Sequence, residues 1–126
     1  MKRIWNFLSG GEGAASDEGR IPWEPLEDIR QLDVILEQSH ERPQLIFKHS
    51  TRCGISAVML RRLEQNWREA HEAADFHFLD ILSHRPVSQA VADHIGLPHQ
   101  SPQVLLIRKG ELLASASHSG ISGLTP

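Results

Sequence analysis

Three short apolar runs, separated by segments with helical periodicity, most limit how this chain can fold. The runs are, in chain order, residues 45–47, 76–82 and 104–107. Largely uninterrupted apolar runs of this length are typical of strands that are buried on both faces of a sheet. The turn pair Lys109-Gly110 follows the third run and leads into residues 111–116, so we expect a hairpin to end the sheet.

Apolar residues recur at helical spacing between these runs. They mark a helix over residues 26–39, with Ile29, Leu32, Ile35 and Leu36. They mark a second over residues 54–72, where one face holds Ile55, Val58, Met59, Leu63 and Trp67. A third helix is predicted over residues 86–95, because Pro86 suits a first helical position and Gly96 and Pro98 suit a helix end.

The order is therefore helix, strand, helix, strand, helix, strand, strand. Two strands joined through a helix are expected to be parallel, with a right-handed crossover, and the closing hairpin adds an antiparallel edge. We predict an α/β fold with a central mixed four-stranded sheet flanked by helices, which is the layout of a thioredoxin-like fold.

The length of 126 residues suits one folded domain, predicted over residues 21–126 and preceded by a flexible leader over residues 1–20. A net charge of −3 and the absence of a long basic run argue against nucleic-acid binding. Asn6 interrupts the apolar start of the leader, so neither a signal peptide nor a membrane span is expected. One cysteine cannot close an internal disulfide, which favours the reducing cytoplasm.

Cys53, this single cysteine, lies between the first strand run and the helix predicted over residues 54–72. A side chain there faces unpaired backbone N–H donors and the positive end of the helix dipole, which favour a thiolate. We therefore predict that Cys53 is reactive, although a lone cysteine can also be a small core residue. The residues expected to stabilise its thiolate are Thr51, Arg52, Gly54 and Ser56.

Ser101-Pro102 immediately precedes the third strand run, and a proline at that entry suggests a cis peptide bond. The eight histidines lack metal-ligand spacing, so no metal site is expected. Two of them are better placed, since His49 ends the strand that leads to Cys53 and His99 opens the loop before Pro102. Lys48 is similarly placed, and the alternative for it is a side chain that is simply solvated. The residues predicted to bind substrate are Ile55, His99, Ser101 and Pro102.

With these residues located, the chain resembles the monothiol bacilliredoxin family (the YtxJ or bacilliredoxin C type) over roughly residues 23 to 122. Three segments carry the resemblance, in the family's order. They are the strand-to-helix segment Lys48-His49-Ser50-Thr51-Arg52-Cys53-Gly54-Ile55-Ser56, the cis-proline loop His99-Gln100-Ser101-Pro102-Gln103 and the tail His118-Ser119-Gly120-Ile121.

The chain departs from this family's pattern at Gly54, where proline is usual. The resulting Cys53-Gly54-Ile55-Ser56 is similar to the Cys-Gly-Phe-Ser of monothiol glutaredoxins, which carry iron–sulfur clusters with glutathione. Phe47 stands where thioredoxins keep a buried acid, six residues before the reactive cysteine. The sequence ends at Pro126, where a final helix would be expected, so one face of the sheet is predicted to be less covered.

The resemblance implies an enzyme that reduces protein–bacillithiol mixed disulfides through the Cys53 thiolate. Its partners would be bacillithiol and S-thiolated proteins, without nucleic acid, a membrane or a bound cofactor, and it would act as a monomer. Ser56 occupies the place of the second cysteine of dithiol oxidoreductases, so resolution must come from another thiol. The alternatives left open are an iron–sulfur cluster carrier and a thioredoxin-fold adaptor with an idle cysteine.

Overall fold

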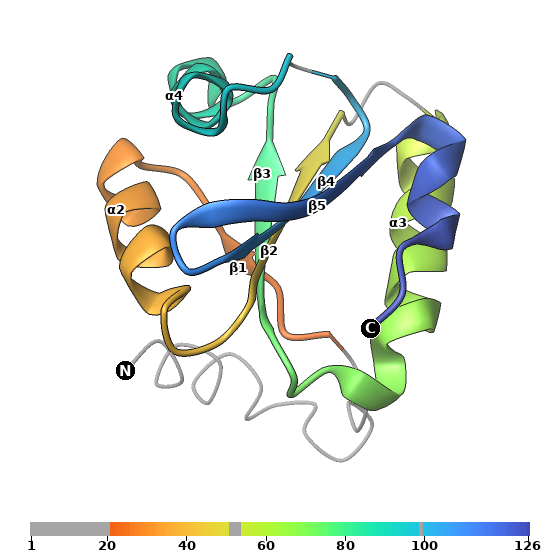
Figure 1. Cartoon of the computed structure of the whole chain (residues 1–126). Coiled ribbons are helices and arrows are strands. Elements are labelled where there is room, and N and C mark those ends of the chain that lie inside the picture. The colour runs from red at the N-terminus through yellow and green to blue at the C-terminus, as the bar shows by residue number, and fades with distance from the viewer. Residues whose placement is uncertain (1–20, 51–53, 99) are drawn as a thin grey trace, which may run out of the picture.

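The computed structural model describes residues 21–50, 54–98 and 100–126. Five strands and three α-helices alternate along them, with two short 3-10 helices (Figure 1). The elements are β1 (Glu24–Pro25), α2 (Ile29–Gln38), β2 (Gln44–His49), α3 (Gly54–Trp67), η2 (Arg68–Ala70), β3 (Asp75–Asp80), α4 (Arg85–Ile95), β4 (Gln103–Arg108), β5 (Glu111–Ser117) and η3 (His118–Gly123). Helix α4 ends at the predicted signal, since Gly96 adopts the left-handed conformation, and α2 begins after Asp28, whose side chain caps it.

The strands form one mixed sheet in the order β1-β3-β2-β4-β5. Strands β1 and β2 both pair with β3 in parallel, whereas β4 runs antiparallel to both β2 and β5. Strand β2 is therefore central, and Leu45, Ile46 and Phe47 are all fully buried. The predicted α/β class is confirmed, with one strand more than the four expected.

The extra strand β1 escaped prediction because it has only two residues, one of them Pro25, and two residues carry no periodic pattern. It lies on the edge of the sheet beside β3.

Helices cover both faces of the sheet, and each face has its own apolar core (Figure 1). Helix α3 packs on one face, where Leu45 and Phe47 join Leu63 and Trp67. Helices α2 and α4 cover the other face, where Ile46 belongs to a second cluster. Alternate residues of β2 thus point to opposite cores, as the pleat of a strand requires.

The apolar face predicted for α3 is buried only in part. Ile55 and Val58 belong to it but are 56% and 37% exposed, whereas Ser56, Met59, Leu63 and Trp67 are buried. One face was predicted to be less covered, and on the α3 side η3 adds cover, since it lies beside α3 (Figure 1). Ile121 of η3 is fully buried in the core on the α3 side, so this short 3-10 helix helps to cover that face of the sheet.

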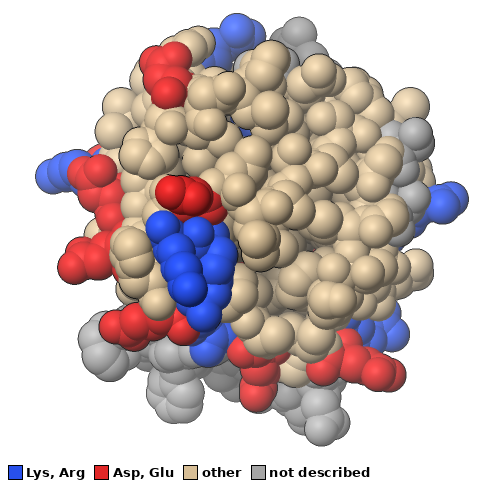
Figure 2. All heavy atoms as spheres, viewed as in Figure 1, with Lys and Arg blue, Asp and Glu red and all other residues tan. Residues whose placement is uncertain are grey.

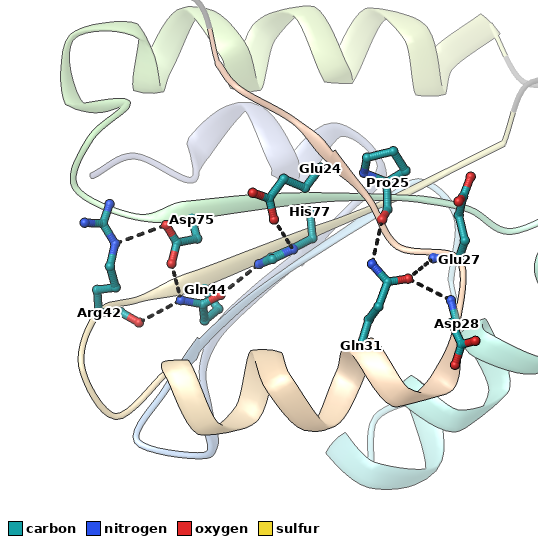
Figure 3. A network of polar contacts seen from close by, with 9 residues as sticks. All are labelled: Glu24, Pro25, Glu27, Asp28, Gln31, Arg42, Gln44, Asp75 and His77. Atoms are coloured by element: carbon teal, nitrogen blue, oxygen red, sulfur yellow. Dashed lines mark hydrogen bonds and ion pairs between the residues drawn. The ribbon is translucent and has the colours of Figure 1, made fainter. Parts of the chain in front are cut away.

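A chain of polar contacts next to α2 links the strands β1, β3 and β2 (Figure 3). The Gln44 amide nitrogen donates to Asp75 Oδ2 at 2.6 Å, and Asp75 Oδ1 lies 3.1 Å from Arg42 Nε. This fixes the Gln44 carbonyl as the acceptor for His77 Nε2, at 2.8 Å. His77 Nδ1 faces the Glu24 carboxylate of β1 at 3.9 Å. These buried contacts tie the short edge strand to the centre of the sheet.

The face seen in Figure 2 is largely uncharged over its centre and right, and its charged side chains lie mainly towards the left and lower margins. Strand β5 crosses this side of the molecule (Figure 1), and after Glu111 it carries only uncharged residues. Within the described part of the chain, no helix is long and apolar enough to cross a membrane.

Candidate active site

The carboxyl end of β2 and the start of β4 lie side by side, at the same end of the strands. Lys48 pairs with Gln103 in the antiparallel register, so His49 and Pro102 both lie just beyond that pair, at this end of the strands. Helix α3 begins at Gly54, the residue that follows Cys53 in the sequence. The first N–H groups of a helix have no intrahelical acceptor, so this junction offers donors for an anion.

Ser56 is held from two sides although it lies in the first turn of α3. Its hydroxyl oxygen accepts the Ser50 N–H at 3.2 Å and lies 2.7 Å from His49 Nδ1. The side chain is fully buried. Ser56 therefore links the end of β2 to the start of α3, which the sequence did not reveal because seven residues separate His49 from Ser56.

His49 lies in a largely apolar environment. Its ring centroid is 5.1 Å from that of Phe78 and 6.0 Å from that of Phe47. Burial lowers the pKa of His49, and the Asp80 carboxylate opposes this in part. The neutral imidazole is therefore favoured at neutral pH.

Lys48 is 1% exposed, so the alternative in which it is simply solvated was wrong. Its ammonium donates to Gln103 Oε1 at 3.2 Å, and the Gln103 amide nitrogen donates to the Pro98 carbonyl at 3.4 Å. These bonds connect β2 to the loop before β4. Burial lowers the pKa of Lys48 to about 8. The signal missed in the sequence was its position, since it directly follows a strand run that is buried on both faces.

The loop that enters β4 has a cis peptide bond between Ser101 and Pro102. The Pro102 carbonyl accepts the His118 N–H at 3.0 Å, so this acceptor is already used. The Ser101 hydroxyl oxygen is buried, and none of its hydrogen-bond partners lies within the described part of the chain.

Several predicted site residues lie outside the described residues, namely Thr51, Arg52, Cys53 and His99. Of the others, Gly54 and Ile55 are exposed at the start of α3, and Ser56 is buried behind them. Pro102 is buried and Ser101 is partly buried, and both lie close to the carboxyl end of β2.

A cluster of three or more metal-capable side chains is absent from residues 21–50, 54–98 and 100–126. Cys53, the ligand in the iron–sulfur alternative, is not among these residues, so that alternative stays a prediction.

Solved structures with this arrangement of strands and helices are those of thioredoxins and their relatives. The chain superposes with a TM-score of 0.70 on a protein described as a candidate oxidoreductase with a thioredoxin fold. The two are 25% identical, over 79% of this chain and 85% of that chain. Thioredoxin Mala s 13 of Malassezia sympodialis gives a TM-score of 0.64 at 14% identity, over 79% and 81%. Mitochondrial thioredoxin 3 of Saccharomyces cerevisiae, in its oxidized form, gives 0.64 at 15% identity, over 79% and 86%.

The fold therefore places this protein in the thioredoxin-like class. Within that class the sequence matches the monothiol bacilliredoxin BrxC family over residues 24–125. That match spans most of the domain, and the chain belongs to this family. Family and fold together support a thiol redox function.

Proposed function

We propose that this protein is a monothiol thiol–disulfide oxidoreductase that removes bacillithiol from S-thiolated proteins, with Cys53 as its nucleophile. The observation that carries the proposal is the BrxC family match over residues 24–125, in a chain whose single cysteine directly precedes the first residue of α3. A thiolate is the attacking form of cysteine, and a helix N-terminus lowers the pKa of a thiol placed there.

In the proposed reaction the Cys53 thiolate attacks the bacillithiol sulfur of a mixed disulfide. The substrate S–S bond breaks, a bond forms between Cys53 and bacillithiol, and the reduced protein leaves as a thiolate that takes a proton from solvent. Free bacillithiol, or a partner reductase, then attacks the new disulfide and restores Cys53. When free bacillithiol acts, it is the reductant: the two electrons end in the thiol of the substrate protein, and bacillithiol disulfide is the oxidised product.

Ser56 makes an external reductant necessary, because a hydroxyl cannot attack a mixed disulfide as a second cysteine would. We assign substrate contact to the exposed Ile55 and to the loop of His99, Ser101 and Pro102. Because the His118 N–H occupies the Pro102 carbonyl, an incoming chain would pair with the backbone just before it, at Ser101. We assign Arg52 and Thr51 the role of stabilising the Cys53 thiolate.

The proposal includes a cytoplasmic location and a monomeric state. A lone thiol that is kept reduced suits the cytoplasm, and the proposed chemistry uses one cysteine per chain. The partners are bacillithiol and thiolated proteins, with no resident cofactor.

The test is the release of bacillithiol from a bacillithiolated protein, followed by mass spectrometry with free bacillithiol as reductant. Cys53→Ser should abolish release, because the nucleophile is lost, and Ser115→Ala on the exposed part of β5 should leave it unchanged. Release by Cys53→Ser at the wild-type rate would reject the proposal. Anaerobic reconstitution with iron and sulfide would then test the cluster alternative, which requires a coloured protein.

A further inference from the structure

We infer that the outward side of α3 is the surface on which the thiolated protein docks, and that it selects a partner with an apolar residue near its modified cysteine and acidic residues further along. This role rests on the proposed function and deepens it by naming the chemistry of the protein substrate. Helix α3 lies at one side of the molecule, away from α2 and α4 (Figure 1). The surface, which we call the α3 outer face, consists of the exposed residues Ile55, Val58, Arg61, Arg62 and Gln65.

The α3 outer face begins with two apolar side chains. Ile55 and Val58 are exposed, while the opposite side of the helix buries Met59 and Leu63 against the sheet. Isoleucine and valine are among the residues most often buried in folded proteins. Exposed apolar side chains that lie together are a feature of interaction surfaces. Because Ile55 is the second residue of α3 and Cys53 directly precedes the helix, this apolar end adjoins the proposed nucleophile along the chain.

Two arginines continue the α3 outer face. Arg61 and Arg62 lie three and four residues after Val58, the spacing at which side chains are neighbours on a helix surface. Within the described part of the chain, neither guanidinium forms an ion pair. The acid nearest to them along α3, Glu64, has another partner, because its Oε2 accepts the Trp23 Nε1–H at 2.7 Å. The positive charge of the two arginines is thus open to a partner molecule.

This positive charge runs against the charge of the whole chain, which is −3. Other arginines are paired with acids of the chain itself: Arg30 lies 2.9 Å from Asp28, and Arg42 lies 3.1 Å from Asp75. The basic stretch is also short, since Glu69 brings an acid to η2 beyond it. A local positive surface on an acidic protein is complementary to an acidic partner.

The length of the surface suits a protein rather than the small thiol. Ile55 and Arg62 are seven residues apart in the sequence. That separation is about 10 Å along a helix, which about three residues of an extended chain can span. A partner can therefore place an apolar side chain on Ile55 and acidic ones on the arginines while its modified cysteine stays at the start of α3. Exchange with free bacillithiol should not need the arginines.

The test compares two synthetic peptides that carry one bacillithiolated cysteine with a leucine on either side. One peptide has three glutamates at each end, and the other has three lysines. At low salt the wild-type chain should release bacillithiol from the glutamate peptide with a kcat/KM about tenfold higher, and added salt should reduce this ratio. The net charge of −3 by itself favours the opposite order. Equal values, or a preference for the lysine peptide, would overturn the inference.

Charge reversal then locates the preference on the helix. Arg62→Glu should remove most of it by raising KM for the glutamate peptide at unchanged kcat, because docking precedes the exchange. Lys109→Glu, at the exposed hairpin turn, changes the net charge equally and should keep the preference. A preference that survives in Arg62→Glu, or is lost equally in Lys109→Glu, would contradict the assignment to α3.

The apolar end is tested in the same assay. Val58→Ser should raise KM about threefold for both peptides, since the lost contact is apolar and independent of charge. Val34→Ser, at an equally exposed type of position on α2, is the matched control and should leave KM unchanged. Equal KM values in the two variants would overturn the inference.

A binding measurement decides the matter when neither peptide is turned over. The glutamate peptide, with serine in place of its cysteine, is titrated into the isotope-labelled full chain and followed by NMR. The backbone amide signals of Ile55, Val58 and Arg62 should shift, and that of Val34 should not. Shifts confined to other residues would overturn the inference. Absence of release from both peptides rejects the proposed function, whereas release without charge preference rejects only the docking role of α3.

Discussion

At the scale of single residues, two polar side chains at the end of β2, Lys48 and His49, connect this strand to the elements around the candidate site. Lys48 and His49 follow a fully buried apolar run, and their side chains bond in different directions. Lys48 reaches Gln103 on β4, and His49 reaches Ser56 on α3. The strand thereby supports both the loop before β4 and the first turn of α3, between which the proposed reaction would occur.

Lys48 should make the free energy of unfolding vary with pH in the alkaline range. Its pKa is about 8 in the folded chain against 10.5 for an unburied lysine. Between these values the unfolded chain holds a proton that the folded chain has released, so the free energy of unfolding should rise with pH. The slope from this group is at most about 1.4 kcal/mol per pH unit.

Urea unfolding between pH 7 and 10.5 checks this prediction. Lys48→Met should remove that part of the rise, while Lys109→Met, at an exposed turn position, should retain it. Tyrosine is absent from the sequence, so it cannot contribute. A Lys48→Met curve parallel to the wild type would contradict the assignment.

At the scale of elements, α3 begins in a way that the family's usual proline would also permit. Among the described residues, a Cβ added at Gly54 would meet no atom within 4 Å, and glycine is not needed there for a left-handed backbone. Proline suits the first position of a helix, where the N–H has no intrahelical partner. Gly54 thus keeps one N–H donor beside Cys53 that the usual proline would lack.

Gly54→Pro should therefore stabilise the protein, by about 0.4–1 kcal/mol in the free energy of unfolding, because it restricts the unfolded chain. Gly54→Ala, which retains the N–H, is the matched control and should stabilise as well. Of the two, Gly54→Pro should show the higher Cys53 pKa on alkylation. Destabilisation by proline alone would show that the Gly54 N–H or its backbone angles are needed in the folded chain.

At the scale of the whole molecule, the sequence predicted the order of elements well because each long element carries its own periodicity or apolar run. Strand β1 and the segment η3 were missed, since both are short and owe their place to tertiary contacts. Glu24 of β1 lies against His77 (Figure 3). Ile121 of η3 fills the core beside α3. Neither contact leaves a local pattern.

The candidate site was predicted less completely than the fold. Spacing and chain position singled out Cys53, Ser56 and Pro102, because a helix start and a strand entry are readable from sequence. The pairing of His49 with Ser56 and the burial of Lys48 depend on which side of β2 each residue faces and on what packs there. Those facts arise only when the sheet and α3 come together.

The most direct test of the central claim is the intact mass of the full chain after brief reaction with a bacillithiolated protein. The account predicts one bacillithiol per wild-type chain, located on Cys53 by fragmentation, removed by excess free bacillithiol, and absent from Cys53→Ser. A wild-type chain that releases bacillithiol from the substrate without ever carrying it would contradict the account.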